Sequence, residues 1–457
     1  MRISLFEADR IWRPGSLIPV DGSPPYTEAD WPMDGYLFFA RPGWSVDFNE
    51  EYNSGFDFDE IYNRTIEEIR EFPDILTPRI NVRGEGDFTI YGSPYSERIF
   101  GGTGNDWLSG GDDGPDGEAD YLVGAAGDDT YVVANGATEV VEFAYDQYDE
   151  WPQDNVDAGG WDRVIASVDF TLPDFVEQLE LRGGAIQGSG NALANVLIGS
   201  DAANRLYGLD GDDRISGGAG NDRLDGGNGD DRLDGGKNQD ILIGGAGDDV
   251  AIGGFQNDQA LGGAGNDRLY GDLASTIGAG SRGGNDTLNG EDGDDILFGD
   301  ALTIVAGGSG GRDRLEGGEG NDRLYGDAES LSENARGGDD FLLGGAGDDY
   351  LFGGGAFAAG SYGGDDRLDG GTGNDRLWGG SGADRFLFGS GFGNDVIEDF
   401  DGAGAGDRID LSAFALEWSA LDISYDSAGA LIRAEAFGPS SILLTGIGSL
   451  QPGDFLF

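Results

Sequence analysis

The chain has 457 residues, a formal net charge of −60 at pH 7, 87 glycines, and neither cysteine nor histidine. The missing residues exclude disulfides, thiolate nucleophiles, Ser-His-Asp and Cys-His catalytic systems, and zinc sites built on cysteine or histidine. Nucleic acid and anionic membrane surfaces need basic partners, so the negative charge disfavours both and favours cations.

Residues 1–91 contain no internal repeat and are rich in Trp, Phe and Tyr. The segment Phe58–Phe72 has helical spacing of apolar residues, and Pro73 would end that helix. We therefore predict a small α+β capping domain with an aromatic core. A carbohydrate-binding or glycosidase-like site remains open here, without an assigned catalytic residue. Neither a signal-peptide-like run nor a membrane-spanning stretch is expected.

A nine-residue pattern, G-G-x-G-x-D-x-U-x with U apolar, recurs without insertion from Gly190 to Tyr270. Glycines at positions 1, 2 and 4 permit a tight turn. The three residues after position 6 are expected to be extended, with Leu224 on one side and Arg223 and Asp225 on the other. Because one such strand cannot bury its apolar face alone, many turns must stack.

This pattern is the known sequence signature of calcium-binding parallel β-helices, and the chain resembles the RTX (hemolysin-type) calcium-binding repeat family. The resemblance implies an all-β fold, a right-handed parallel β-roll (β-solenoid) in which two nonapeptides make one turn. We expect a small α+β N-terminal cap and a β C-terminal cap around it. The implied cofactor is Ca²⁺, as multiple ions, held by position-6 aspartates and turn carbonyls from loops one turn apart.

The predicted metal ligands are the position-6 aspartates. They are Asp106, Asp120, Asp129, Asp213, Asp222, Asp231, Asp240, Asp249, Asp258, Asp267, Asp286, Asp295, Asp313, Asp322, Asp340, Asp349, Asp366, Asp375, Asp384 and Asp395. Two units before the main block have Asn195 and Asn204 at this position, so we expect them to bind weakly or to act only as caps.

Some repeat units depart from the pattern. Asn238 and Gln256 replace the glycine of position 4, and Ala251 and Ala260 replace the large apolar residue of position 8. We predict that units 235–261 are the softest part of the roll, with weaker ion sites and a thin core.

Four loops after Tyr270 carry insertions, and these occur at every second loop. They are Gly271–Asp286, Gly299–Asp313, Gly326–Asp340 and Gly353–Asp366. If two loops make one turn, all four insertions stack along the same edge. Two interpretations remain open, neutral drift after repeat duplication and a contact surface.

The segment Ala383–Phe414 resembles the end of the repeat region in serralysin-type secreted proteins, although a protease domain of that type would need histidine. The final residues, "SILLTGIGSLQPGDFLF", resemble an uncleaved type I secretion signal, and capping strands with a tail are the alternative. The predicted domains are 1–91 (cap), 92–133 (first repeat block), 134–189 (irregular β-solenoid connector without calcium loops), 190–398 (main roll) and 399–457 (β-cap with secretion signal).

The resemblance implies a calcium-binding protein that is secreted, extracellular or on the cell surface, with the type I secretion machinery as a partner. We expect a non-enzymatic structural, matrix or adhesin-like protein that folds on extracellular calcium. The alternative is an extracellular polysaccharide-acting enzyme with a carboxylate or Tyr/Arg site outside the calcium loops. A pore-forming toxin is disfavoured because no long apolar segment is present. Surface polysaccharide and self-assembly stay open as partners.

Overall fold

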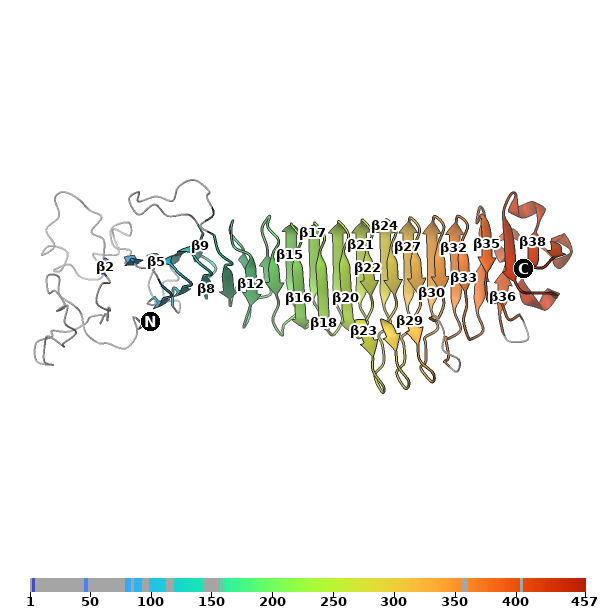
Figure 1. Ribbon diagram of the computed structural model, residues 1–457, viewed down its shortest axis with the longest axis horizontal. Helices are drawn as coiled ribbons and strands as arrows, with labels where there is room; N and C mark the ends of the chain where they lie inside the picture. The colour runs from blue at the N-terminus through green and yellow to red at the C-terminus, as the bar shows by residue number, and fades with distance from the viewer. Residues whose placement is uncertain are drawn as a thin grey trace, which may run out of the picture. The chain divides into compact units, whose positions relative to one another are not determined.

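The computed structural model describes residues 2–4, 45–47, 79–83, 86–92, 98–111, 119–142, 157, 159–355, 361–402 and 406–457. The chain divides into two compact units, Met1–Leu193 and Ala194–Phe457. Among the described residues, strands dominate both units, and the only helices are short 3₁₀ turns such as Ser412–Phe414 (Figure 1). The predicted helix Phe58–Phe72 lies outside the described residues, so the α+β cap stays a prediction.

The unit Ala194–Phe457 consists mainly of two parallel sheets whose strands alternate along the chain. The first contains β14 (Val196–Ile198), β16 (Arg214–Ala219), β18 (Arg232–Lys237), β20 (Val250–Phe255), β22 (Arg268–Tyr270), β25 (Ile296–Phe298), β28 (Arg323–Tyr325), β31 (Tyr350–Phe352), β33 (Arg376–Trp378) and β35 (Asn394–Ile397). The second contains β15 (Arg205–Asp210), β17 (Arg223–Asn228), β19 (Ile241–Ala246), β21 (Gln259–Ala264), β24 (Thr287–Asp292), β27 (Arg314–Glu319), β30 (Phe341–Ala346), β32 (Arg367–Thr372), β34 (Arg385–Leu387) and β36 (Arg408–Asp410).

The register of these sheets follows two repeats per turn. Leu224 of β17 pairs with Leu242 of β19, and Leu233 of β18 pairs with Ala251 of β20. Each pair of nonapeptides thus completes one turn, with one strand in each sheet. The predicted parallel β-roll is confirmed.

The core of the roll is a ladder of position-8 side chains between the two sheets. Leu224, Leu233, Leu242 and Leu269 are each 0% exposed. Burying one such side chain contributes about 1.5–3 kcal/mol, and stacking lets every turn share its apolar surface with the next.

The units 235–261 keep the same strands and register as their neighbours. Ala251 and Ala260 occupy the core and are fully buried. Asn238 and Gln256 adopt left-handed φ values of 77° and 87°, a conformation that side-chain-bearing residues rarely adopt. The neighbouring turns therefore impose the loop geometry on these two residues, and the lower stability of this region stays a prediction.

Outside this core, aromatic side chains at position 9 form a stack on the outer face of the first sheet. Tyr270, Phe298, Tyr325, Phe352 and Trp378 follow one another with ring centroids 4.5–5.0 Å apart. Ile252, which pairs with Tyr270, belongs to one buried apolar cluster with Tyr270 and Phe298. Apolar packing on the outer face therefore begins where the alanines thin the inner core.

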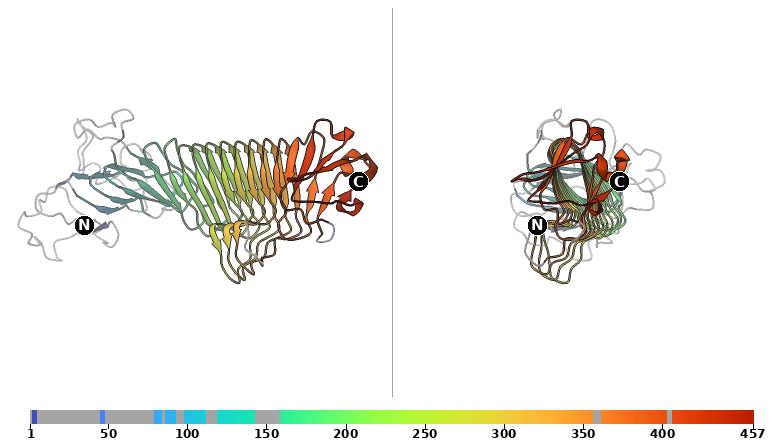
Figure 2. Two further views of the ribbon diagram at one scale, coloured as in Figure 1. Left: turned by 45° about the vertical axis from the view of Figure 1, so that its right-hand side comes forward. Right: turned by 90° about the vertical axis from the view of Figure 1, so that its right-hand side faces the viewer.

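The insertions build a third parallel sheet of β23 (Leu273–Ile277), β26 (Ala301–Ile304) and β29 (Ala328–Leu331). These strands bury a small core of their own that includes Ile277, Ile304 and Leu331. Isolated bridges join Arg282, Ser309, Arg336 and Tyr362 in succession, so the fourth insertion follows the other three. The predicted stacking along one edge is confirmed, as Figure 2 shows for this unit.

The end of the chain closes the roll. Strand β39 (Ser441–Thr445) pairs in parallel with β35, and β40 (Phe455–Leu456) pairs with β36, so both sheets receive a final strand. An antiparallel group of β37 (Asp422–Tyr425), β38 (Gly429–Arg433) and β39 completes the cap. The predicted C-terminal β-cap is confirmed.

The unit Met1–Leu193 also contains stacked parallel strands. One series is β3 (Arg79–Arg83), β5 (Arg98–Thr103), β7 (Tyr121–Ala126) and β9 (Glu139–Val141). The other is β4 (Thr89–Tyr91), β6 (Trp107–Ser109), β8 (Thr130–Val133), β10 (Arg163–Ala166) and β12 (Gln178–Leu181). In addition, β11 (Phe170–Thr171) pairs in parallel with β13 (Gln187–Ser189). Parallel stacking thus extends through the predicted connector 134–189.

Candidate metal sites along the loops

The position-6 aspartates of the unit Ala194–Phe457 form two columns. In the first, the main-chain N–H of Asp213 donates to Oδ1 of Asp231 at 2.7 Å, and that of Asp231 donates to Asp249 at 2.7 Å. In the second, Asp222 donates in the same way to Asp240, also at 2.7 Å. The neighbour of each aspartate is therefore the one a full turn further along the chain, as the spacing predicts.

All the predicted ligands in this unit belong to these columns. The first column contains Asp213, Asp231, Asp249, Asp267, Asp295, Asp322, Asp349, Asp375 and Asp395. The second contains Asp222, Asp240, Asp258, Asp286, Asp313, Asp340, Asp366 and Asp384.

The second carboxylate oxygen of each of these aspartates is buried and receives no hydrogen bond. The same holds for Asp106 and Asp129 in the other unit, whereas Asp120 is 8% exposed and does not share this feature. No ion pair among the described residues involves a column aspartate. An unpaired buried carboxylate is costly, so each Oδ2 requires a cation or a proton.

The glycine at position 1 leaves space beside each of these oxygens. A Cβ on Gly235 would lie 2.7 Å from Oδ2 of Asp240 and 2.6 Å from the carbonyl oxygen of Gly253, one turn on. A Cβ on Gly226 would likewise lie closer than 3.0 Å to Oδ2 of Asp231 and to the carbonyl oxygen of Gly244. Carboxylate and carbonyl oxygens are the ligands that Ca²⁺ prefers, so these residues fit the ion.

Burial dominates the electrostatics of the columns. It raises the pKa of Asp231 to about 6, of Asp213 and Asp240 to about 7, and of Asp258 to about 8. The hydrogen bond that each Oδ1 accepts lowers these pKa values, and neighbouring carboxylates raise them. A bound Ca²⁺ would supply the missing positive charge and would displace protons from these groups.

The ends of the columns differ from their middle. Asn195 and Asn204 donate their main-chain N–H groups to Asp213 and Asp222 at 2.6 and 2.7 Å, so they begin the two columns. At the other end, Asp407 accepts from Asp384 through Oδ1 and from Asp401 through Oδ2. Both oxygens of Asp407 are thus satisfied by protein donors, which ends the second column.

A corresponding column exists in the unit Met1–Leu193. Asp106 donates to Asp129, Asp129 to Asp162, and Asp162 to Glu177, each at 2.7 Å. Asp162 lies in the segment 134–189, which was predicted to lack calcium loops, and it was not among the predicted ligands. The available signal was "GWDRV" at Gly160–Val164, which matches the G-x-D-x-U part of the repeat.

A further carboxylate joins this column from the end of β9. Ligand atoms of Asp129, Glu142 and Asp162 all lie within 4.8 Å of one another, and all three residues are buried. The hydroxyl of Tyr131 donates to Glu142 and accepts the N–H of Gly124 at 2.8 Å. Burial raises the pKa of Glu142 to about 10, so this cluster, too, calls for a cation or a proton. Glu142 occupies no repeat position, and no sequence signal marked it.

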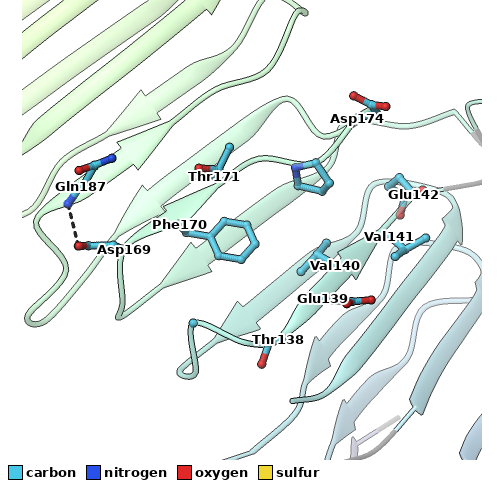
Figure 3. Close-up of a pocket in the computed structure, with 12 residues that line it drawn as sticks. Thr138, Glu139, Val140, Val141, Glu142, Asp169, Phe170, Thr171, Asp174 and Gln187 are labelled. Atoms are coloured by element: carbon cyan, nitrogen blue, oxygen red, sulfur yellow. Dashed lines mark hydrogen bonds between the residues drawn. The ribbon is translucent and has the colours of Figure 1, made fainter. Parts of the chain in front are cut away.

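A pocket of about 620 Å³ lies beside this cluster, between β9 and β11 (Figure 3). Glu139, Glu142, Asp169 and Asp174 contribute carboxylates to its lining, and Phe170 contributes an aromatic ring. Among the described residues that line it, none is Tyr or Arg. The pocket therefore offers carboxylates but neither Tyr nor Arg among these residues, and an enzymatic carboxylate or Tyr/Arg site stays a prediction.

Comparisons with known proteins agree with this geometry. The family model described as RTX calcium-binding nonapeptide repeat (4 copies) matches residues 91–113, 189–224, 207–242, 217–251, 243–274, 282–301, 307–329, 334–356 and 361–397. No curated protein matches the chain. In the part of the chain that the structure describes, no helix has the length and apolar character needed to cross a membrane. The chain belongs to the RTX, or hemolysin-type, calcium-binding repeat proteins.

Proposed function

We propose that this calcium-binding repeat protein is secreted unfolded and folds outside the cell when calcium fills its aspartate columns. The observation that carries the proposal is the buried, unpaired Oδ2 of every column aspartate from Asp213 to Asp395. Where calcium is scarce, these carboxylates repel one another, and the many glycines add entropy to the unfolded chain. Millimolar extracellular calcium binds only the folded roll and stabilises it by mass action.

The position of the proposed secretion signal supports this order of events. In the folded chain, Ser441–Thr445 and Phe455–Leu456 are strands β39 and β40, which pair with β35 and β36. A transporter that reads these residues would therefore meet them as a free segment only before the roll folds. Export through type I machinery and folding by calcium are thus consistent steps of one process.

For the folded protein we propose a non-enzymatic structural, matrix or adhesin-like role outside the cell or at its surface. Most buried acidic residues of the unit Ala194–Phe457 are position-6 aspartates with an unpaired Oδ2, and its apolar residues form a continuous core, which supports a scaffold role. Such a roll is a rigid scaffold once calcium is bound. The alternative is an extracellular polysaccharide-acting enzyme, for which the carboxylate-lined pocket between β9 and β11 is the candidate site.

The test is far-UV circular dichroism of the full chain in chelator, in millimolar Ca²⁺ and, as a control, in Mg²⁺. We expect strand signal and a cooperative thermal transition only with Ca²⁺, because Mg²⁺ demands a smaller octahedral site. Equal strand content and equal melting with and without chelator would contradict the proposal. Export is tested separately by fusing residues 399–457 to an unrelated passenger in cells that carry a type I transporter.

A further inference from the structure

A second series of buried aspartates lies in the inserted loops, outside position 6. Asp272, Asp300 and Asp327 each follow the first glycine of an inserted loop, at position 2, where the repeat usually has glycine. All three residues are 0% exposed. The main-chain N–H of Asp272 donates to the carbonyl oxygen of Asp300 at 3.0 Å, and that of Asp300 to Asp327 at 2.9 Å, so the three stack one turn apart.

The side chains of Asp300 and Asp327 are only partly satisfied, whereas the N–H of Gly284 donates to both carboxylate oxygens of Asp272 at 3.0 Å. Gly311 donates to Oδ1 of Asp300 at 2.9 Å, and Gly338 donates to Oδ1 of Asp327 at 2.6 Å. Oδ2 of Asp300 and Oδ2 of Asp327 are buried and have no hydrogen-bond partner. Apart from the column aspartates and Glu142, no other described carboxylate has this feature. The two residues therefore share the property that distinguishes the calcium-loop aspartates.

Glycines keep space between these carboxylates. A Cβ on Gly283 would lie closer than 3.0 Å to oxygens of both Asp272 and Asp300. A Cβ on Gly310 would be equally close to oxygens of both Asp300 and Asp327. At Gly310 one of these oxygens is the unpartnered Oδ2 of Asp300, whereas the two oxygens at Gly283 each also accept a main-chain N–H group. At each glycine two carboxylates from successive turns approach one point, which is the arrangement that a bridging cation needs.

The charge of the surroundings increases the need for a cation. Asp286, Asp313 and Asp340 of the second column are neighbours of this series. The charge of Asp286 raises the pKa of Asp272, that of Asp300 raises the pKa of Asp313, and that of Asp327 raises the pKa of Asp340. No ion pair among the described residues involves any of these six carboxylates. Arg312 and Arg314, on either side of Asp313 in the sequence, instead pair with Asp339 and Glu316. Compensation must therefore come from bound cations or from protons.

We propose that Asp272, Asp300 and Asp327 form an additional column of Ca²⁺ sites at the base of the inserted loops. One ion lies between Asp272 and Asp300 beside Gly283, and a second lies between Asp300 and Asp327 beside Gly310. These ions fasten the sheet β23–β26–β29 to the roll. The fourth inserted loop has Gly354 at position 2, so the column ends at Asp327. The proposal goes beyond calcium-dependent folding, because the roll could fold on its position-6 sites alone.

The test compares calcium stoichiometry of the full chain and of D300N, measured by equilibrium dialysis and elemental analysis at saturating Ca²⁺. Asp300 faces both proposed ions, so D300N is expected to lose two bound ions relative to the natural chain. The matched control is E333Q, which removes one charge from an exposed position in an inserted loop and is expected to lose none. An unchanged ion count in D300N would overturn the proposal and would indicate that protons neutralise the series.

A second measurement keeps the inference testable if D300N does not fold. Crystals of the natural chain grown with Ca²⁺ should show anomalous density beside Gly283 and Gly310. Density confined to the position-6 columns would overturn the proposal while leaving calcium-dependent folding intact. Loss of calcium-dependent folding itself would appear independently, as equal circular dichroism with and without chelator.

Discussion

The substitution Gly226→Ala tests whether the position-1 glycines hold space for ions. Gly226 does not adopt a left-handed φ, so alanine is compatible with its backbone conformation. Its Cβ would nevertheless lie closer than 3.0 Å to Oδ2 of Asp231 and to the carbonyl oxygen of Gly244. The substitution therefore occupies the space for one ion and leaves the turn geometry otherwise possible.

The expected loss of stability has two parts. Forcing a methyl group into packed surroundings costs about 1–3 kcal/mol. Losing one ion that is present at a hundred times its Kd costs about 2.7 kcal/mol. Alanine restricts the unfolded chain and returns about 0.4–1 kcal/mol. The free energy of unfolding at saturating calcium should therefore fall by about 3–5 kcal/mol.

The assay is urea unfolding at saturating Ca²⁺ together with a count of bound ions. The control is Gly389→Ala, because a Cβ there meets no atom within 4 Å and the backbone is not left-handed. We expect G226A to lose stability and at least one ion, and G389A to lose neither. Equal stability and equal ion counts in the two variants would refute the assignment of this space to an ion.

Two further predictions concern pH and strain. Burial raises the pKa of Asp213 to about 7 and of Asp258 to about 8, so the folded state binds more protons than the unfolded state. In chelator, the folded state should therefore become less stable as the pH rises from about 4 to about 8. At saturating Ca²⁺ stability should instead rise with pH, because protons compete with the ion for the carboxylates. Melting temperatures measured at acidic and neutral pH, in chelator and in Ca²⁺, test both trends. Gln256→Gly should remove the strain of a left-handed φ of 87° and stabilise units 235–261 by up to about 1 kcal/mol. Amide hydrogen exchange in these units should become slower, and unchanged exchange would contradict the prediction.

The nine-residue period predicts most of the fold and of the aspartate columns. The position of a residue within the nonapeptide determines whether it lies in a strand or a loop and which face of the strand its side chain occupies. This is why Asp222 could be assigned to Asp240 as its neighbour without coordinates. Asp162 was missed because 33 residues separate it from Asp129, so the period is lost although the local motif survives. Glu142 belongs to no repeat position, and only the fold brings it to Asp129.

The buried aspartates of the inserted loops could not be predicted from the sequence for a different reason. The three Gly-Asp pairs that contain Asp272, Asp300 and Asp327 are visible in the sequence, but position 2 is a place where side chains can also point to solvent. Leu209 at the same position is 48% exposed. Burial of the aspartates depends on the inserted loop that covers them, and neither its path nor its sheet follows from the nonapeptide pattern.

The glycines of the repeat separate into two classes when their geometry is compared. Gly227 at position 2 and Gly229 at position 4 have φ values of 112° and 128°, so backbone conformation favours glycine there. These positions still vary, since Leu209 occupies position 2 and Gln256 position 4, each with a left-handed φ.

Position 1 shows the opposite behaviour. From Gly199 to Gly379 every unit has glycine there, yet Gly226 and its equivalents do not adopt left-handed φ values. Turn geometry therefore does not explain the glycine at position 1, whereas the space beside Oδ2 of the aspartate and the carbonyl of the next turn does. Position 1 is thus the least variable position of the repeat, and a side chain there would occupy the proposed ion site. We infer that calcium binding, more than the conformation of the turn, accounts for this glycine.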